Sequence, residues 1–165
     1  GFQLWINMPA KLKMNKPEYF YIKNNQLGIH EDKEKLVKVI AGKFEKAEGP
    51  QKGHNIDPMY FHVMLEEDKE FKCTIPNSHN SFVYLLAGDL SIGKNNHDKI
   101  GNSNLILLDR GDELIVKANK KSEFLFIAGK PIGEPIARGG PFVMNTKAEI
   151  LQAVKDYHNG TFAKY

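Results

Sequence analysis

Short apolar segments that end in turn residues recur through the middle of this chain, and they constrain its fold more than any other feature. They follow one another roughly every 8 to 12 residues, and Gly, Pro, Asn or Asp separates them. The segments are residues 36–40, 59–65, 71–75, 82–86, 90–92, 105–108, 113–118 and 124–127. This spacing, without alternating strands and helices, favours an antiparallel sandwich or barrel over a parallel sheet. The sequence therefore predicts an all-β fold.

The C-terminal segment has the period of a helix instead. Thr146 and Glu149 have the spacing of a capping box, in which the hydroxyl and the carboxylate each accept a backbone N–H at the start of a helix. Apolar residues then recur on one helical face: Ile150, Leu151, Val154 and Tyr157. Residues 159–160, Asn-Gly, are typical of a helix end. We expect a short closing helix after the strands.

The N-terminal segment alternates with a period of two. Phe2, Leu4 and Ile6 fall on one side, and Pro9 ends the pattern, which predicts a half-buried strand. Residues 10–31 are rich in Lys and Asn and are typical of an extended connector. The chain begins at Gly1 without an initiator Met, and we expect that it is part of a longer protein.

The amino-acid composition of the chain argues against several classes of function. The chain has 165 residues, of which 41% are hydrophobic and 26% charged, as in ordinary globular domains. The net charge is only +3, and Arg110 and Arg138 are its two arginines, so direct nucleic-acid binding is not expected. No apolar run approaches the roughly 18 residues of a membrane span. Cys73 is the single cysteine, which favours a reducing intracellular compartment, cytoplasmic or nuclear.

The chemistry-bearing residues form no recognisable catalytic motif. His54, His62 and His79 lack metal-ligand spacing and can converge only through the fold, so we interpret them as half-buried or surface histidines. Cys73 lies within a predicted strand and is interpreted as a buried, inert thiol. The acidic residues 66–68 are interpreted as a solvated hairpin turn. The sequence therefore predicts no catalytic, cofactor-binding or metal-binding residue in this chain.

Several segments resemble the pirin family. They are residues 1–11 (GFQLWINMPAK), 82–89 (FVYLLAGD), 134–136 (EPI) and 140–146 (GPFVMNT). Pirins are bicupins, and the resemblance implies the C-terminal half: an antiparallel cupin, a double-stranded β-helix or jelly-roll-like barrel, with a short C-terminal helix. On this basis residues 1–30 are a strand and connector from the N-terminal barrel. Residues 31–145 are the C-terminal cupin barrel, and residues 146–165 are the helix and tail.

The resemblance also implies where a metal lies. In pirins, three histidines and a glutamate hold iron in the N-terminal barrel, which this chain does not contain. When the cupin metal motif is aligned on Gly88, Ser81 takes the glutamate position and residues 74–77 take the histidine positions; an alignment on Gly111 places Leu114 at a histidine position. We therefore expect a metal-free barrel, no cofactor in this chain, and iron in the N-terminal half.

Two functions remain open from the sequence. In the first, the chain is the structural and protein-interaction half of an iron-binding transcription coregulator. In the second, it is the non-catalytic half of a quercetin 2,3-dioxygenase-like enzyme. The expected partner is the N-terminal pirin barrel or a second copy, through the strand that begins at Phe2 and ends at Ile6; transcription factors are a further expected class. A small ligand in the barrel mouth is a third alternative.

Overall fold

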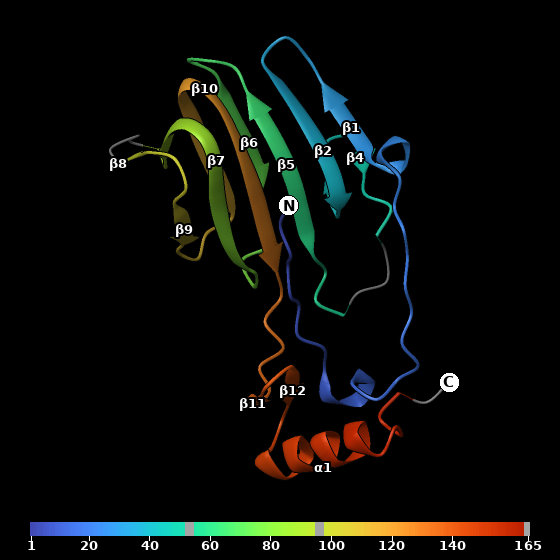
Figure 1. Ribbon diagram of the computed structural model, residues 1–165. Helices are drawn as coiled ribbons and strands as arrows, with labels where there is room; N and C mark the ends of the chain where they lie inside the picture. The colour runs from blue at the N-terminus through green and yellow to red at the C-terminus, as the bar shows by residue number, and fades with distance from the viewer. Residues whose placement is uncertain (52–54, 95–97, 164–165) are drawn as a thin grey trace. The chain divides into compact units, whose positions relative to one another are not determined.

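The computed structural model describes residues 1–51, 55–94 and 98–163, which form two compact units (Figure 1). The barrel unit is Ile22–Pro131. The terminal unit combines Gly1–Tyr21 with Ile132–Tyr165.

The barrel unit is built from antiparallel strands, so the all-β prediction is confirmed. After a 3₁₀ turn, η2 (Asn24–Gln26), the strands are β1 (Gly28–Glu31), β2 (Lys35–Ala41), β3 (Lys43–Phe44), β4 (Ala47–Glu48), β5 (Met59–Leu65), β6 (Glu70–Thr74), β7 (Asn80–Ile92), β8 (Asp98–Ile100), β9 (Leu105–Leu108) and β10 (Glu113–Gly129). The main sheet has the order β1-β2-β5-β10-β7-β8; β6 also pairs with β10, and β9 with β7. β3 and β4 form a separate hairpin.

Two long strands, β7 and β10, replace four of the expected short ones. The turns expected at residues 87–89 and 119–121 are instead irregular positions within continuous strands, where the β7–β10 register shifts between Ala118 and Phe124. Gly88 permits this with a φ of 102°, a conformation that few other residues adopt. The Ser122 hydroxyl accepts the Asp89 N–H at 3.0 Å and lies 2.7 Å from the Lys120 carbonyl, to which it donates. The turn-like residues therefore bend the strands without ending them.

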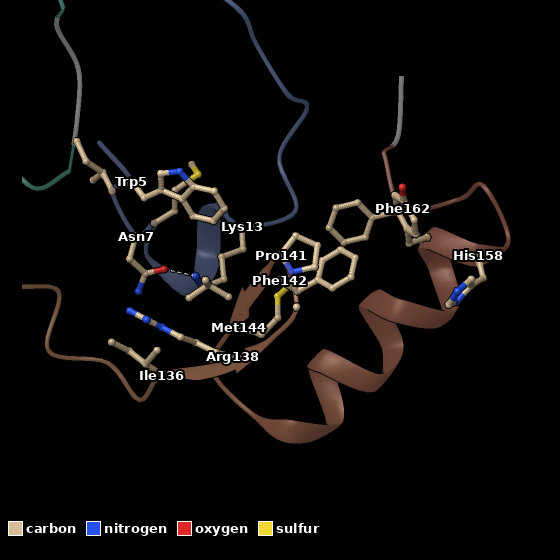
Figure 2. A pocket seen from close by; sticks show the side chains of 15 residues that line it. Trp5, Asn7, Lys13, Ile136, Arg138, Pro141, Phe142, Met144, His158 and Phe162 are labelled. Atoms are coloured by element: carbon tan, nitrogen blue, oxygen red, sulfur yellow. Dashed lines mark hydrogen bonds between the residues drawn. The ribbon is translucent and has the colours of Figure 1, made fainter. Parts of the chain in front are cut away.

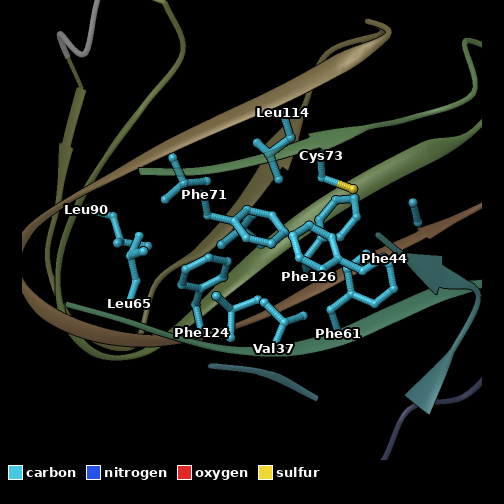
Figure 3. Packing of buried hydrophobic residues seen from close by; sticks show 14 of the residues in the cluster. Val37, Phe44, Phe61, Leu65, Phe71, Cys73, Leu90, Leu114, Phe124 and Phe126 are labelled. Atoms are coloured by element: carbon cyan, nitrogen blue, oxygen red, sulfur yellow. The ribbon is translucent and has the colours of Figure 1, made fainter. Parts of the chain in front are cut away.

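A cluster of aromatic rings fills the interior of the barrel unit (Figure 3). Alternate residues of β5 and β10 point inward, and Phe61, Phe71, Phe124 and Phe126 are completely buried. The Phe44 and Phe71 rings stack at 5.2 Å between centroids, and Phe71 meets Phe124 edge-on at 5.6 Å. These rings form the centre of the hydrophobic core.

The terminal unit contains η1 (Ala10–Leu12), the hairpin β11 (Ala137–Gly139) and β12 (Phe142–Met144), and helix α1 (Lys147–His158). The predicted capping box is confirmed: the Glu149 N–H donates to the Thr146 hydroxyl at 3.2 Å, and the Thr146 N–H donates to the Glu149 carboxylate at 2.7 Å. In the described part of the chain, no helix has the length and apolar character needed to cross a bilayer.

The strand expected at the N-terminus is not formed. Residues 1–9 do not adopt strand structure, and Phe2 and Trp5 are 63% and 67% exposed. The alternating pattern was misleading because a strand also requires a neighbour to satisfy its backbone groups. This segment instead leads into η1, where the Ala10 N–H donates to the Glu134 carboxylate at 2.8 Å. The expected connector, residues 10–31, also contains β1, which pairs with β2.

Candidate functional site

The environment of His79 indicates a structural role. The residue is 5% exposed. Its Nε2 lies 2.9 Å from the Asp57 carbonyl oxygen, and its Nδ1 lies 3.3 Å from the Ser78 hydroxyl. Nε2 donates to the carbonyl oxygen, which can only accept, and the Ser78 hydroxyl serves as the partner of Nδ1. His79 is therefore a buried histidine whose ring nitrogens are already occupied.

His62 lies on the other side of the sheet from the aromatic core. It is half-buried on β5, and its Nε2 lies 2.6 Å from the Glu123 carboxylate on β10. The ring N–H donates to this carboxylate, which orients the side chain. The pair is one histidine and one carboxylate, which is fewer ligands than a metal centre uses.

The described residues do not fit a metal ion. Within residues 1–51, 55–94 and 98–163, no group of three or more His, Cys, Asp or Glu side chains is arranged to hold one. Ser81 and Leu114, which occupy motif positions, are buried, and Leu114 belongs to the apolar core. His54 lies outside the described residues. The absence of a metal from the whole chain stays a prediction.

Cys73 is buried, as the sequence predicts. Its thiol lies in the aromatic cluster at 7% exposure and 3.4 Å from the Thr74 carbonyl oxygen. Burial raises the pKa of Cys73 to about 12. At neutral pH the thiol is therefore protonated, which makes it a poor nucleophile.

The outward side of the main sheet in the barrel unit carries apolar side chains in register; we call it the outer sheet face. Two rows cross it, because residues paired across antiparallel strands share a face. In one row Leu125 pairs with His62 and Tyr84, and Tyr84 with Leu105; in the other, Ile127 pairs with Tyr60 and Phe82, and Phe82 with Leu107. At the β9 edge, Leu105 and Leu107 are 57% and 78% exposed.

The sequence of β9 carries a signal for this face. Strand β9 reads Leu-Ile-Leu-Leu, with apolar residues on both sides. Ile106 and Leu108 pack against the core, whereas Leu105 and Leu107 point outward. A strand that is apolar on both faces is typical of a sheet covered on both sides. The outer sheet face is therefore a candidate interaction surface.

The terminal unit contains a second candidate, a groove of about 1070 Å³ (Figure 2). The N-terminal segment, the β11–β12 hairpin and the end of α1 line it. Its lining includes Trp5, Asn7, Lys13, Arg138, Phe142 and Phe162. Sequence reasoning missed this groove because residues more than a hundred positions apart build it; the signal available was Arg138, one of only two arginines, beside a Gly-Gly-Pro turn.

Comparisons with known proteins agree on one family. Residues 60–163 match the Pirin C-terminal cupin domain. A pirin-like protein of Caulobacter vibrioides is 35% identical over 98% of this chain and 58% of its own length. Pirin-1 of Arabidopsis thaliana is 36% identical over 96% of this chain and 56% of its own length.

A solved structure agrees with these matches. The crystal structure of quercetin 2,3-dioxygenase from Acinetobacter baumannii has a TM-score of 0.87 and 29% identity, and the match covers 97% of this chain and 56% of that one. The cupin fold expected from the resemblance is thus confirmed. The chain spans less than two thirds of the length of these relatives.

Proposed function

Since the chain belongs to the pirin family through its C-terminal cupin domain, we propose that it is the structural and protein-interaction half of a two-barrel protein. The observation that carries this proposal is the distribution of apolar side chains in the barrel unit. Phenylalanine rings fill its interior, while the outer sheet face carries further apolar residues: Leu125 is buried there, and Leu105 and Leu107 at the β9 edge are exposed by more than half. The barrel is therefore arranged to be packed against, and not to enclose a substrate.

The proposed partner is the N-terminal pirin barrel. The relatives are longer than this chain, and the matched part is 58% of the Caulobacter protein and 56% of the Acinetobacter structure. A second barrel accounts for the remaining length. Its apolar surface would cover Leu105 and Leu107, each exposed by more than half, and burial of such surface contributes about 25 cal/mol per Å².

We propose the outer sheet face for this contact, in addition to the contact through residues 2–6 that the resemblance implies. A second copy of the chain is the alternative occupant of the same face. The proposal retains the further expectations of the resemblance: iron in the N-terminal half, a metal-free barrel here, transcription-factor partners, a coregulator role, and a cytoplasmic or nuclear location.

The test uses this chain and the part of the Caulobacter pirin-like protein that lies outside the match. We expect a one-to-one complex by light scattering, weakened at least about tenfold in calorimetric titration by Leu107→Glu, because a buried charge without a partner is costly. Leu151→Glu is the matched control, since Leu151 is 73% exposed and belongs to α1 of the terminal unit. The proposal fails if no complex forms, or if both variants weaken it equally.

A dioxygenase is the second candidate function, and the name of the Acinetobacter structure favours it. In this alternative the pair of halves consumes oxygen with quercetin, and the present chain contributes no reacting group. We expect no oxygen consumption from the chain alone. Turnover by the isolated chain at the rate of the pair would contradict both functions as stated here.

A further inference from the structure

The groove of the terminal unit has hydrogen-bond donors at one end that the protein does not use up. Lys13 donates to the Asn7 side-chain oxygen at 2.6 Å, so the one acceptor of that amide is already engaged. Within the described residues, the Arg138 guanidinium has no hydrogen bond or ion pair; the residue is exposed, and Figure 2 shows it extending toward Asn7 and Lys13. The guanidinium, the remaining ammonium protons and the Asn7 NH₂ are all donors.

The charge of the groove has one sign. Its basic side chains are Lys13, Arg138 and His158, and no Asp or Glu belongs to the lining in the described part of the chain. Two carboxylates elsewhere in the terminal unit accept backbone N–H groups: Glu134 from Ala10 and Glu149 from Thr146. Glu149 also interacts electrostatically with Lys13, so Arg138 is the cation of the groove without a charged partner among the described residues. The surplus of positive charge and donors is therefore complementary to an anion that accepts two hydrogen bonds, and a planar carboxylate matches the Arg fork.

Aromatic side chains form the other end of the groove. Phe142 meets Phe162 at 5.0 Å between centroids with an interplanar angle of 63°, and Tyr157 at 5.9 Å. Figure 2 shows Phe142 and Phe162 facing each other across the end of the hairpin, with Trp5 on the N-terminal segment nearer the cationic end. An apolar, ring-bearing body fits here, because aromatic rings gain from offset or edge-on contact beyond simple burial.

We propose that this groove binds a small aromatic carboxylate, with the carboxylate on Arg138 and Lys13 and the ring among Phe142, Phe162 and Tyr157. The volume of about 1070 Å³ is close to the upper end of the roughly 300–1000 Å³ of small-molecule sites. The site belongs to the terminal unit, so it does not depend on the proposed packing of the outer sheet face.

Ligand binding can be measured through the fluorescence of Trp5, because it is the single tryptophan of the chain and lines the groove. The full chain is titrated with 4-phenylbutyrate while tryptophan fluorescence is followed, and with 4-phenylbutyramide and butyrate as matched probes. We expect saturable binding of 4-phenylbutyrate, at least about tenfold weaker binding of the neutral amide, and weaker binding of butyrate, which lacks the ring.

Variants locate the contact. We expect Arg138→Gln to weaken the binding of 4-phenylbutyrate about tenfold and to leave the binding of 4-phenylbutyramide unchanged. We expect Arg138→Lys to weaken 4-phenylbutyrate binding less, because it retains the charge. Arg110→Gln is the matched control, since Arg110 is the other arginine, is exposed, and lies in the barrel unit.

The proposal is overturned if no probe saturates, if the amide and the carboxylate bind equally, or if both Gln variants behave alike. It is also overturned if light scattering shows self-association that Arg138→Gln abolishes, because a second copy then occupies the groove.

Discussion

The barrel unit and the terminal unit bury their apolar side chains to very different degrees. The barrel unit has a continuous core of completely buried rings and aliphatic chains, including Phe61, Phe71 and Phe126. In the described part of the terminal unit, the buried hydrophobic residues are Met144 and Ala153, whereas Trp5 and Phe20 are 67% and 65% exposed. Strand pairing and a shared core therefore stabilise the first unit, whereas the second has few buried apolar side chains.

Because of this difference, we expect the barrel unit to contribute most of the stability and the terminal unit to bind the ligand. The barrel unit completely buries four phenylalanine rings in its core, and its outer sheet face is the surface that we propose for a partner. The terminal unit is held by a capping box, a short hairpin and single hydrogen bonds such as the one from Asn145 to Glu134 at 3.0 Å. Its aromatic and cationic side chains consequently remain available to a ligand. Variants in each unit test whether stability and ligand binding depend on different units.

The largest effect is expected in the barrel core. Phe126→Ala should lower the free energy of unfolding by about 3–5 kcal/mol, because it removes a completely buried ring and leaves a cavity. Phe20→Ala, at an exposed ring, should change it by less than about 0.5 kcal/mol. Urea unfolding followed by circular dichroism measures both. If Phe126→Ala does not fold, Phe126→Leu replaces it. Equal effects at positions 126 and 20 would contradict the contrast between the units.

The next effect tests the bend that lets β7 and β10 continue. Gly88→Ala should cost about 2–4 kcal/mol, because a Cβ there meets the Ser122 Cα at 2.6 Å and the Lys121 carbonyl oxygen at 2.7 Å, in addition to the unfavourable backbone angle. Gly93→Ala is the control: its φ of 90° is similar, but its Cβ meets nothing within 4 Å. Thermal unfolding compares them, and an equal loss would assign the whole effect to backbone strain.

The smallest effect is expected at the start of α1. Thr146→Ala should destabilise the terminal unit by about 1 kcal/mol through loss of the cap, while Thr146→Ser should retain it. Hydrogen exchange of the α1 amides separates this local loss from the barrel unit. Protection that falls equally in β5 and β10 would show that the units unfold together.

The same cap makes α1 sensitive to pH. The Thr146 hydroxyl and N–H hold the pKa of Glu149 below its ordinary value of 4.5. A carboxylate with a lowered folded-state pKa stabilises the fold above its ordinary value, and this contribution is lost as pH falls through the lowered one. We expect α1 protection to exceed that of Glu149→Gln at neutral pH, with the difference disappearing in acid.

Much of the architecture could be predicted from local patterns. The segments at 59–65 and 105–108 appear as β5 and β9, and Thr146 with Glu149 begins α1 as expected. These predictions held because alternation, turn residues and capping act over a few neighbouring residues. They failed where a partner decides the outcome: residues 2–6 alternate without a neighbouring strand, and residues 87–89 and 119–121 bend strands that Ser122 and the β7–β10 pairing keep continuous.

By itself, the sequence determined the all-β fold, its closing helix and its family, because periodicity and motifs are local properties of the chain. Tertiary structure alone decided what surfaces those elements present. The apolar rows of the outer sheet face arise from strand register, as in the pairing of Leu125 with Tyr84 and of Tyr84 with Leu105. The donors of the groove, Lys13 and Arg138, come from opposite ends of the chain. Surfaces of this kind depend on which distant residues the fold brings together, and no window along the sequence contains that information.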